Sequence, residues 1–201
     1  MQKAIKRTSP TENKGQRQVR AISKAEVLAY TQDYKEQLRY RALAAFMFLT
    51  GARISEALNV YDDDIKYMQH NGISIARVKL ITLKQRGIKK NRPRYVFVDL
   101  DDDGDLWLCF QQYAKRIVVP HSKVFNFHRW SGWAHIKKHF KERDHALRHA
   151  FVDYMSEKGL SASYVLDSLG DSAQMLDVYK HKFEERTMLD LLTRNKKERI
   201  K

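Results

Sequence analysis

Three short segments far apart in the chain carry residues suited to chemistry on a phosphate group. Arg53 lies in the first segment, Arg148 lies in the second, and the third ends at Tyr179. Planar guanidinium groups donate paired hydrogen bonds to phosphate oxygens and stabilise the charge these oxygens gain when the phosphorus is attacked. A phenol hydroxyl can act as the attacking nucleophile. If the three segments meet in space, their residue types indicate cleavage of a phosphodiester.

Each segment also has a recognisable local pattern. Thr50–Glu56 reads T-G-x-R-x-S-E, and His145–His149 reads H-x-L-R-H. Leu169–Ser172 reads L-G-D-S and is followed by a Y-x-H triplet that begins at Tyr179. The order and spacing of these patterns resemble the catalytic signature of the tyrosine recombinase (phage integrase) family, over roughly residues 21–181.

This resemblance implies a role for each central residue. Tyr179 is the expected nucleophile, which forms a covalent 3′-phosphotyrosyl link and releases a 5′-hydroxyl, while Arg53 and Arg148 hold the phosphate. Because the link conserves the energy of the broken bond, rejoining needs neither ATP nor another cofactor. His145 corresponds to the family histidine that accepts or shuttles the tyrosine proton.

The leaving 5′-oxygen needs a proton, which the family takes from a lysine in a β-hairpin. Lys84 is the expected general acid, because Thr82-Leu83-Lys84 resembles the strand end that carries the family lysine. Lys89 and Lys90 remain alternatives, and each could instead face solvent or bind phosphate. A lysine can serve as an acid when neighbouring cations lower its pKa toward the working pH.

Asp171 departs from the family pattern, which usually has a histidine or tryptophan that donates to the phosphate at this position. An ionised carboxylate cannot donate and would repel the developing charge. Losing such a donor costs about 10²- to 10³-fold in rate at comparable sites. Three explanations stay open: Asp171 orients an arginine, it is protonated, or His149 or His181 donates in its place.

The composition favours a polyanionic partner. The 201 residues include 38 Lys and Arg against 24 Asp and Glu, which gives a formal net charge of +14. This balance makes nucleic acid the leading candidate, and the resemblance implies that the chain binds double-stranded DNA, through a basic hairpin tip and through histidines beside the catalytic segments. The predicted DNA-binding residues are Arg86, Lys89, Lys90, Arg92, His149 and His181.

Several other classes of protein are disfavoured. Cys109 is the only cysteine, which excludes disulfide scaffolds and cysteine-based zinc sites. Two histidine pairs have i,i+4 spacing, His135/His139 and His145/His149, but both lie among basic residues and no metal is expected. No apolar run approaches the roughly 20 residues of a membrane span. We expect a soluble, DNA-associated protein in the cytoplasm of a prokaryotic cell or a virus-infected host.

The hydrophobic pattern predicts an α+β fold, mainly helical with one small antiparallel β-sheet or hairpin. A capping box at Ser23–Glu26 should start a helix through Val27, Tyr30, Tyr34 and Leu38. The further expected elements are a buried helix over 41–49, a short helix over 54–58, strands over 73–83 and 95–100, a helix that begins in the acidic run 101–105 and stops before Pro120, and helices over most of the remaining chain with breaks at Gly159 and Gly170.

We expect three parts along the chain. Residues 1–20 form a basic flexible arm or linker, and 21–182 form the catalytic domain. Residues 183–201 form an amphipathic C-terminal helix, which either packs on its own domain or, as the resemblance implies, docks on a neighbouring protomer of a tetramer on synapsed DNA. The family usually adds an N-terminal DNA-clamping domain, so the chain is either a fragment or a short form that grips DNA with its basic arm.

The expected function is that of a site-specific recombinase or integrase of viral or mobile-element type. A type IB topoisomerase would use the same nucleophile and arginines to relax DNA instead of exchanging partners. A catalytically impaired DNA-binding protein on the same fold is the alternative from another class, with Asp171 as the mark of lost chemistry.

Overall fold

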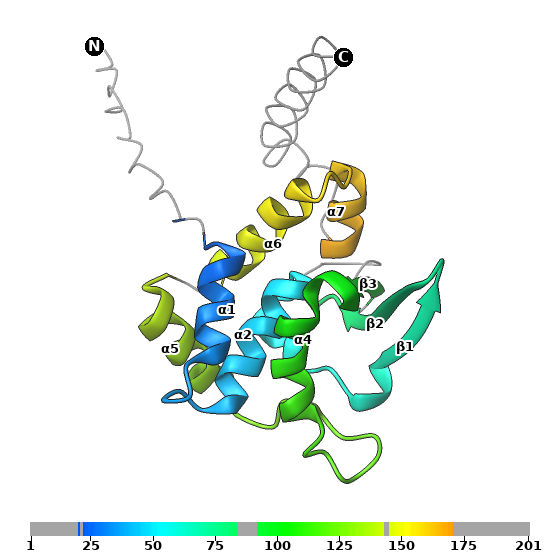
Figure 1. Ribbon diagram of the computed structural model, residues 1–201. Coiled ribbons are helices and arrows are strands. Elements are labelled where there is room, and N and C mark those ends of the chain that lie inside the picture. The colour runs from blue at the N-terminus through cyan, green and yellow to red at the C-terminus, as the bar shows by residue number, and fades with distance from the viewer. Residues whose placement is uncertain (1–19, 21, 84–91, 143–144, 171–201) are drawn as a thin grey trace, which may run out of the picture.

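The computed structural model describes residues 20, 22–83, 92–142 and 145–170. These residues form a mainly helical α+β fold with one small antiparallel sheet, as the sequence predicts (Figure 1). The elements in chain order are α1 (Lys24–Gln32), α2 (Leu38–Thr50), α3 (Ile54–Ala57), the 3₁₀ turn η1 (Asp62–Asp64), β1 (Ile65–His70), β2 (Ile73–Ile81), β3 (Pro93–Asp99), α4 (Leu100–Ala114), α5 (Arg129–Phe140), α6 (His145–Glu157) and α7 (Ala162–Leu169).

Helix α2 is the centre of the core. Every side chain from Tyr40 to Thr50 is buried, because α1, α4, α5 and α6 all pack around it. A helix that is apolar on all sides needs such complete coverage. The helix ends at Gly51, whose left-handed backbone (φ 59°) turns the chain toward α3. The position of Arg53 is therefore set by the most deeply buried element of the fold.

The sheet has the order β1-β2-β3 with antiparallel pairing throughout. Strand alternation places Ala76, Val78 and Leu80 of β2 in the core, and the inward residues of β3 pack beside them. The predicted hairpin is confirmed, although the second strand begins earlier, at Pro93, and Leu100 already belongs to α4. The sheet therefore fixes both strands that flank the basic hairpin loop, whose residues 84–91 lie outside the described part.

Strand β1 was not predicted from the sequence. Its residues IKYMQH are mostly exposed, so they lack the apolar alternation that identifies a strand. The signal is instead in the turn that follows: Asn71 and Gly72 have φ values of 51° and 82°. Positive φ at both central residues is typical of the type I′ turn, which joins the two strands of a hairpin through a two-residue loop.

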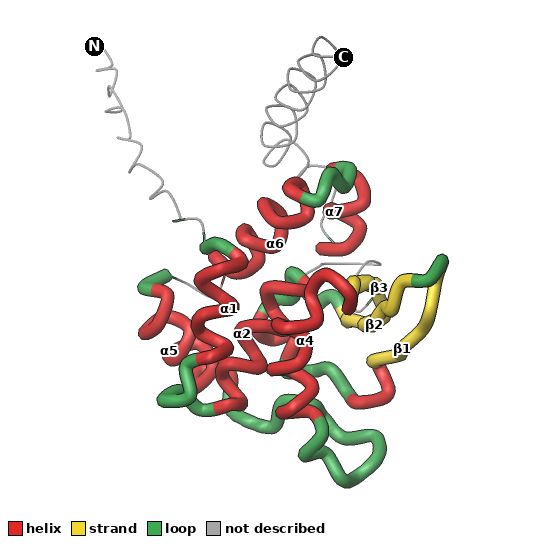
Figure 2. Tube along the Cα trace, viewed as in Figure 1, coloured by secondary structure: helices red, strands yellow, loops and turns green. Residues whose placement is uncertain are grey.

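The helix boundaries correct the prediction in two places. The first helix stops at Gln32, so Tyr34 lies in the following turn with 85% of its surface exposed, and Leu38 starts α2 instead of ending α1. The chain after Pro120 is not helical at once, because residues 115–128 form a long irregular connection before α5 (Figure 2). The predicted breaks at Gly159 and Gly170 are confirmed, and both glycines have positive φ.

Candidate phosphate-binding site

Glu56 organises the first catalytic segment. Its carboxylate accepts the backbone N–H of Arg53 at 2.9 Å and so caps the N-terminus of α3. The same carboxylate pairs with the Arg53 guanidinium, at 2.9 Å between Nη1 and Oε1. The Glu56 side chain is fully buried and that of Arg53 is 17% exposed. Arg53 therefore lies at the rim of the core, held by a carboxylate three residues further along the chain.

Arg148 reaches the same place from α6. Its Nη1 donates to the carbonyl of Gly51 at 2.6 Å and its Nη2 donates to the carbonyl of Leu169 at 2.9 Å. Those carbonyls lie at the C-terminal ends of α2 and α7, where a cation is favoured by the helix dipole and by the unsatisfied acceptors. Arg148 also lies 4.0 Å from a Glu56 oxygen and is 5% exposed. It thus joins two of the predicted catalytic segments through their backbones.

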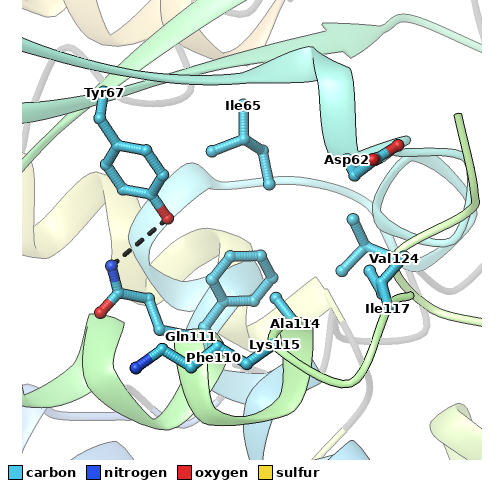
Figure 3. Close-up of a pocket in the computed structure, with 9 residues that line it drawn as sticks. All are labelled: Asp62, Ile65, Tyr67, Phe110, Gln111, Ala114, Lys115, Ile117 and Val124. Carbon is cyan, nitrogen blue, oxygen red and sulfur yellow. Dashed lines mark hydrogen bonds between the residues drawn. The ribbon is translucent and has the colours of Figure 1, made fainter. Parts of the chain in front are cut away.

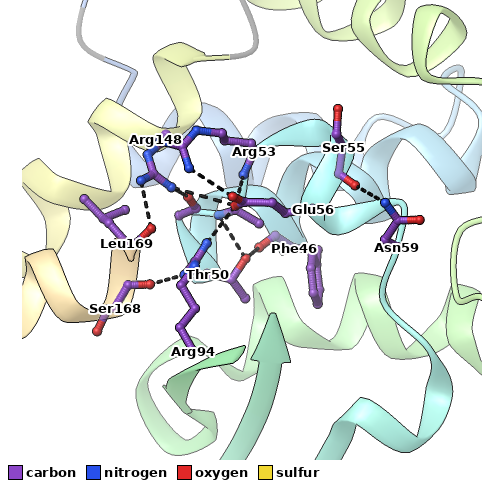
Figure 4. A network of polar contacts seen from close by, with 12 residues as sticks. Phe46, Thr50, Arg53, Ser55, Glu56, Asn59, Arg94, Arg148, Ser168 and Leu169 are labelled. Carbon is purple, nitrogen blue, oxygen red and sulfur yellow. Dashed lines mark hydrogen bonds and ion pairs between the residues drawn. The ribbon is translucent and has the colours of Figure 1, made fainter. Parts of the chain in front are cut away.

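A third arginine completes the cluster (Figure 4). Arg94 of β3 donates from Nη2 to Glu56 Oε2 at 2.8 Å and from Nη1 to the carbonyl of Ser168. Neither Arg94 nor the role of Glu56 was predicted from the sequence. A signal was present: Arg94 occupies an inward position of β3, in phase with Val96 and Val98. A charged residue in that phase needs a buried partner of opposite charge.

The electrostatics of the cluster follow from this geometry. Burial works to raise the pKa of the Glu56 carboxyl, but the guanidinium of Arg94, the Arg53 N–H and the charges of Arg53 and Arg148 hold that pKa below its ordinary value. Burial lowers the pKa of Arg94 to about 10, against the attraction of Glu56. Three guanidinium groups thus meet one carboxylate, and their excess positive charge favours an anion at this place.

The structure brings together the predicted residues Arg53 and Arg148. His145 is the exposed first residue of α6, and His149 lies one turn further along, half buried. Arg92 is exposed just before β3. The remaining predicted site residues lie outside the described residues, and they are Tyr179, Lys84, Asp171, Arg86, Lys89, Lys90 and His181.

An apolar pocket lies elsewhere (Figure 3). It has a volume of about 340 Å³ and lies between η1, β1 and the end of α4. Tyr67 and Gln111 meet at its edge, 3.4 Å apart. None of the clustered arginines lines it. Within the described ranges, no group of three His, Cys, Asp or Glu side chains is arranged to hold a metal ion, and no helix is long and apolar enough to cross a membrane.

Comparison with solved structures identifies the fold. The XerH site-specific recombinase bound to its difH substrate aligns with a TM-score of 0.60 and 18% identity, over 83% of this chain and 52% of that one. The XerA recombinase aligns with a TM-score of 0.61 and 17% identity, over 85% and 64%. The Tn1549 transposon integrase in complex with transposon right end DNA aligns with a TM-score of 0.56 and 14% identity, over 90% and 68%.

The chain therefore spans about half the length of XerH, and these identities establish a shared fold only. No curated protein sequence matches the chain. The profile of the phage integrase family, in contrast, matches residues 18–186. Because this match covers most of the sequence and includes every segment that carries a predicted catalytic residue, the chain belongs to the phage integrase family.

Proposed function

We propose that the chain is the catalytic part of a site-specific recombinase or integrase that cleaves and rejoins duplex DNA. The observation that carries this proposal is the convergence of Arg53 and Arg148 on Glu56, from segments 95 residues apart in sequence. Two guanidinium groups in one partly desolvated place suit a phosphate that gains charge during attack. Membership of the phage integrase family supports the same reaction class.

In this reaction the Tyr179 oxygen attacks the scissile phosphorus. A bond forms between the tyrosine oxygen and phosphorus, and the bond from phosphorus to the 5′-oxygen breaks, which leaves a 3′-phosphotyrosyl link and a 5′-hydroxyl. Arg53 and Arg148 stabilise the charge on the non-bridging oxygens. His145 takes the phenol proton, and Lys84 delivers a proton to the 5′-oxygen. Rejoining is the reverse sequence.

DNA is the proposed partner, and the formal charge of +14 supports it. The proposed DNA-binding residues are four of the predicted hairpin and two histidines of the catalytic segments: Arg86, Lys89, Lys90, Arg92, His149 and His181. The protein works as a tetramer on synapsed sites, with residues 183–201 docked on a neighbour, and it acts in a prokaryotic cell or a virus-infected host. Two of the similar solved structures, the XerH recombinase and the Tn1549 integrase, are complexes with DNA, which supports DNA as the partner.

The test is capture of the covalent intermediate. The protein is incubated with a pool of nicked duplexes of random sequence, in which the short fragment released by cleavage diffuses away and prevents rejoining. DNA that stays attached to protein after denaturation is recovered and sequenced, which also identifies the preferred site. Wild-type protein should form the adduct and Tyr179→Phe should form none; an adduct that persists in Tyr179→Phe contradicts the proposed nucleophile.

One sequence observation favours a second candidate, a DNA-binding protein with impaired chemistry. Asp171 stands where the family usually has a phosphate donor. If the carboxylate suppresses cleavage, wild-type protein will bind the selected duplex without forming an adduct, and Asp171→His will restore the adduct. If Asp171 supports the reaction by orienting an arginine, Asp171→His will lower the rate instead.

A further inference from the structure

Arg94 connects three parts of the fold at one point. It lies near the start of β3, and its guanidinium contacts Glu56 of α3 and the Ser168 carbonyl near the end of α7. The chain leaves α7 at Gly170, against which Arg94 packs: a Cβ added to Gly170 would meet Arg94 Cδ at 2.7 Å. The side chain is 5% exposed. A side chain buried to this degree acts through its protein partners and not through broad contact with DNA.

Glu56 would be a problem for phosphate binding if Arg94 were absent. Its carboxylate lies 2.9 Å from Arg53 and 4.0 Å from Arg148, so it competes with a phosphate for both guanidinium groups. Arg94 binds the Oε2 oxygen that faces Arg148, and it does so at 2.8 Å, closer than Arg148 itself. Arg94 therefore interacts with this oxygen more strongly than Arg148 does.

We propose that Arg94 is a positioning residue of the phosphate-binding site, which neutralises Glu56 so that the charges of Arg53 and Arg148 act on the scissile phosphate. Glu56 can then cap α3 and hold Arg53 in place without cancelling the positive charge of the site. This inference rests on the proposed function, since it assigns Arg94 a part in the same reaction.

The experiment measures cleavage in a single turnover with saturating protein, on the duplex selected by adduct capture, together with the dissociation constant and the melting temperature. Arg94→Gln removes the charge and leaves a shorter polar side chain. We expect it to slow cleavage about 10- to 100-fold, less than the about 10²- to 10³-fold for loss of a donor that touches the reacting group. Binding should change by less than about threefold, because many other phosphate contacts supply the affinity.

A charge-restoring variant separates this role from a purely structural one. The double variant Arg94→Gln with Glu56→Gln removes both the cation and the anion, so the net charge of the site returns to that of the wild type. It should cleave at least about threefold faster than Arg94→Gln alone. Arg94→Lys, which keeps the charge, should stay within about threefold of the wild type. If Arg94 had only a structural role, the second substitution would lower the cleavage rate further.

Arg77→Gln is the matched control, because Arg77 lies on the opposite face of the same sheet, over the ring of Tyr95 at 5.1 Å. It should leave the cleavage rate unchanged. If Arg94→Gln does not fold, Arg94→Met takes its place in both comparisons. The inference is overturned if the double variant is no faster than the single one, or if the loss is entirely in the dissociation constant. Wild-type protein that forms no adduct would contradict the proposed function itself. The two outcomes above contradict only the role of Arg94, so the two failures can be told apart.

Discussion

Alanine at position 51 should destabilise the protein more than alanine at position 72, although both glycines have a left-handed backbone. Gly51 has φ +59° and Gly72 has φ +82°. An alanine in this region costs about 1–2 kcal/mol of folding free energy relative to glycine. This conformational cost is common to both sites, and Gly72→Ala should show it alone, since nothing lies within 4 Å of its added Cβ.

At Gly51 a second cost is added. The new methyl group would meet Phe151 Cδ1 at 2.6 Å and Leu169 Cδ2 at 2.7 Å, which is too close for carbon atoms. Excess volume in a packed core typically costs about 1–3 kcal/mol. We therefore expect a loss of about 2–5 kcal/mol for Gly51→Ala. Phe151 belongs to α6 and Leu169 to α7, so the methyl group also pushes on both helices that frame Arg148.

Chemical denaturation measures the two free energies, and the cleavage assay measures the functional effect. Gly51→Ala should lose about 1–3 kcal/mol more than Gly72→Ala and should also slow cleavage, because the Gly51 carbonyl accepts from Arg148 at 2.6 Å. Gly72→Ala should cleave normally. Equal losses at the two positions would refute the reasoning, since close packing would then not be the reason for glycine between α2 and α3.

Three further predictions concern other parts of the molecule. The pKa of Glu56 is lowered in the folded state, so its ionisation stabilises the fold at any pH above its ordinary pKa of 4.5, and this stabilisation is lost as the pH falls through the lower pKa of the folded state. The difference in unfolding free energy between wild type and Glu56→Gln should therefore shrink on acidification below about pH 4.5. Asp103 is buried and pairs with Lys24 at 2.8 Å and Lys158 at 2.9 Å. Asp103→Asn should lower the free energy of unfolding by about 1–3 kcal/mol in chemical denaturation, less than for a fully buried pair because both lysines keep access to water. No measurable loss would contradict the pairing. Arg92→Ala should weaken binding to all duplexes alike and lower the slope of log Kd against log salt by about 1, and an unchanged slope would exclude a phosphate contact there.

The pattern of residues anticipates the fold where one physical signal dominates. The apolar run of α2, the capping box before α1 and the alternation of β2 and β3 each have a single strong cause, and each is observed. The exposed strand β1 lacks such a cause, because its pairing with β2 follows from the Asn71-Gly72 turn and not from burial. The sequence also does not show the end of α1, because Tyr34 and Leu38 continue the i,i+4 spacing from Tyr30 although α1 ends at Gln32.

For the site, local patterns identify the residues but not their partners. Arg53 and Arg148 stand out in their segments, whereas their meeting at Glu56 depends on the way the start of α6 packs against the C-terminal ends of α2 and α7. Arg94 lies in none of the three patterns, and only the inward phase of β3 marks it. Contacts between side chains distant in sequence depend on how whole helices and strands pack, and local sequence patterns do not predict that packing.

The central claim is that two guanidinium groups from distant segments bind one phosphate. A crystal structure of Tyr179→Phe bound to its selected duplex tests it most directly, because this variant should hold the uncleaved phosphate in place. We predict that non-bridging oxygens of the scissile phosphate lie about 3 Å from nitrogens of both Arg53 and Arg148. A scissile phosphate that contacts neither arginine, with both side chains still occupied by Glu56 and the backbone carbonyls, would contradict the account.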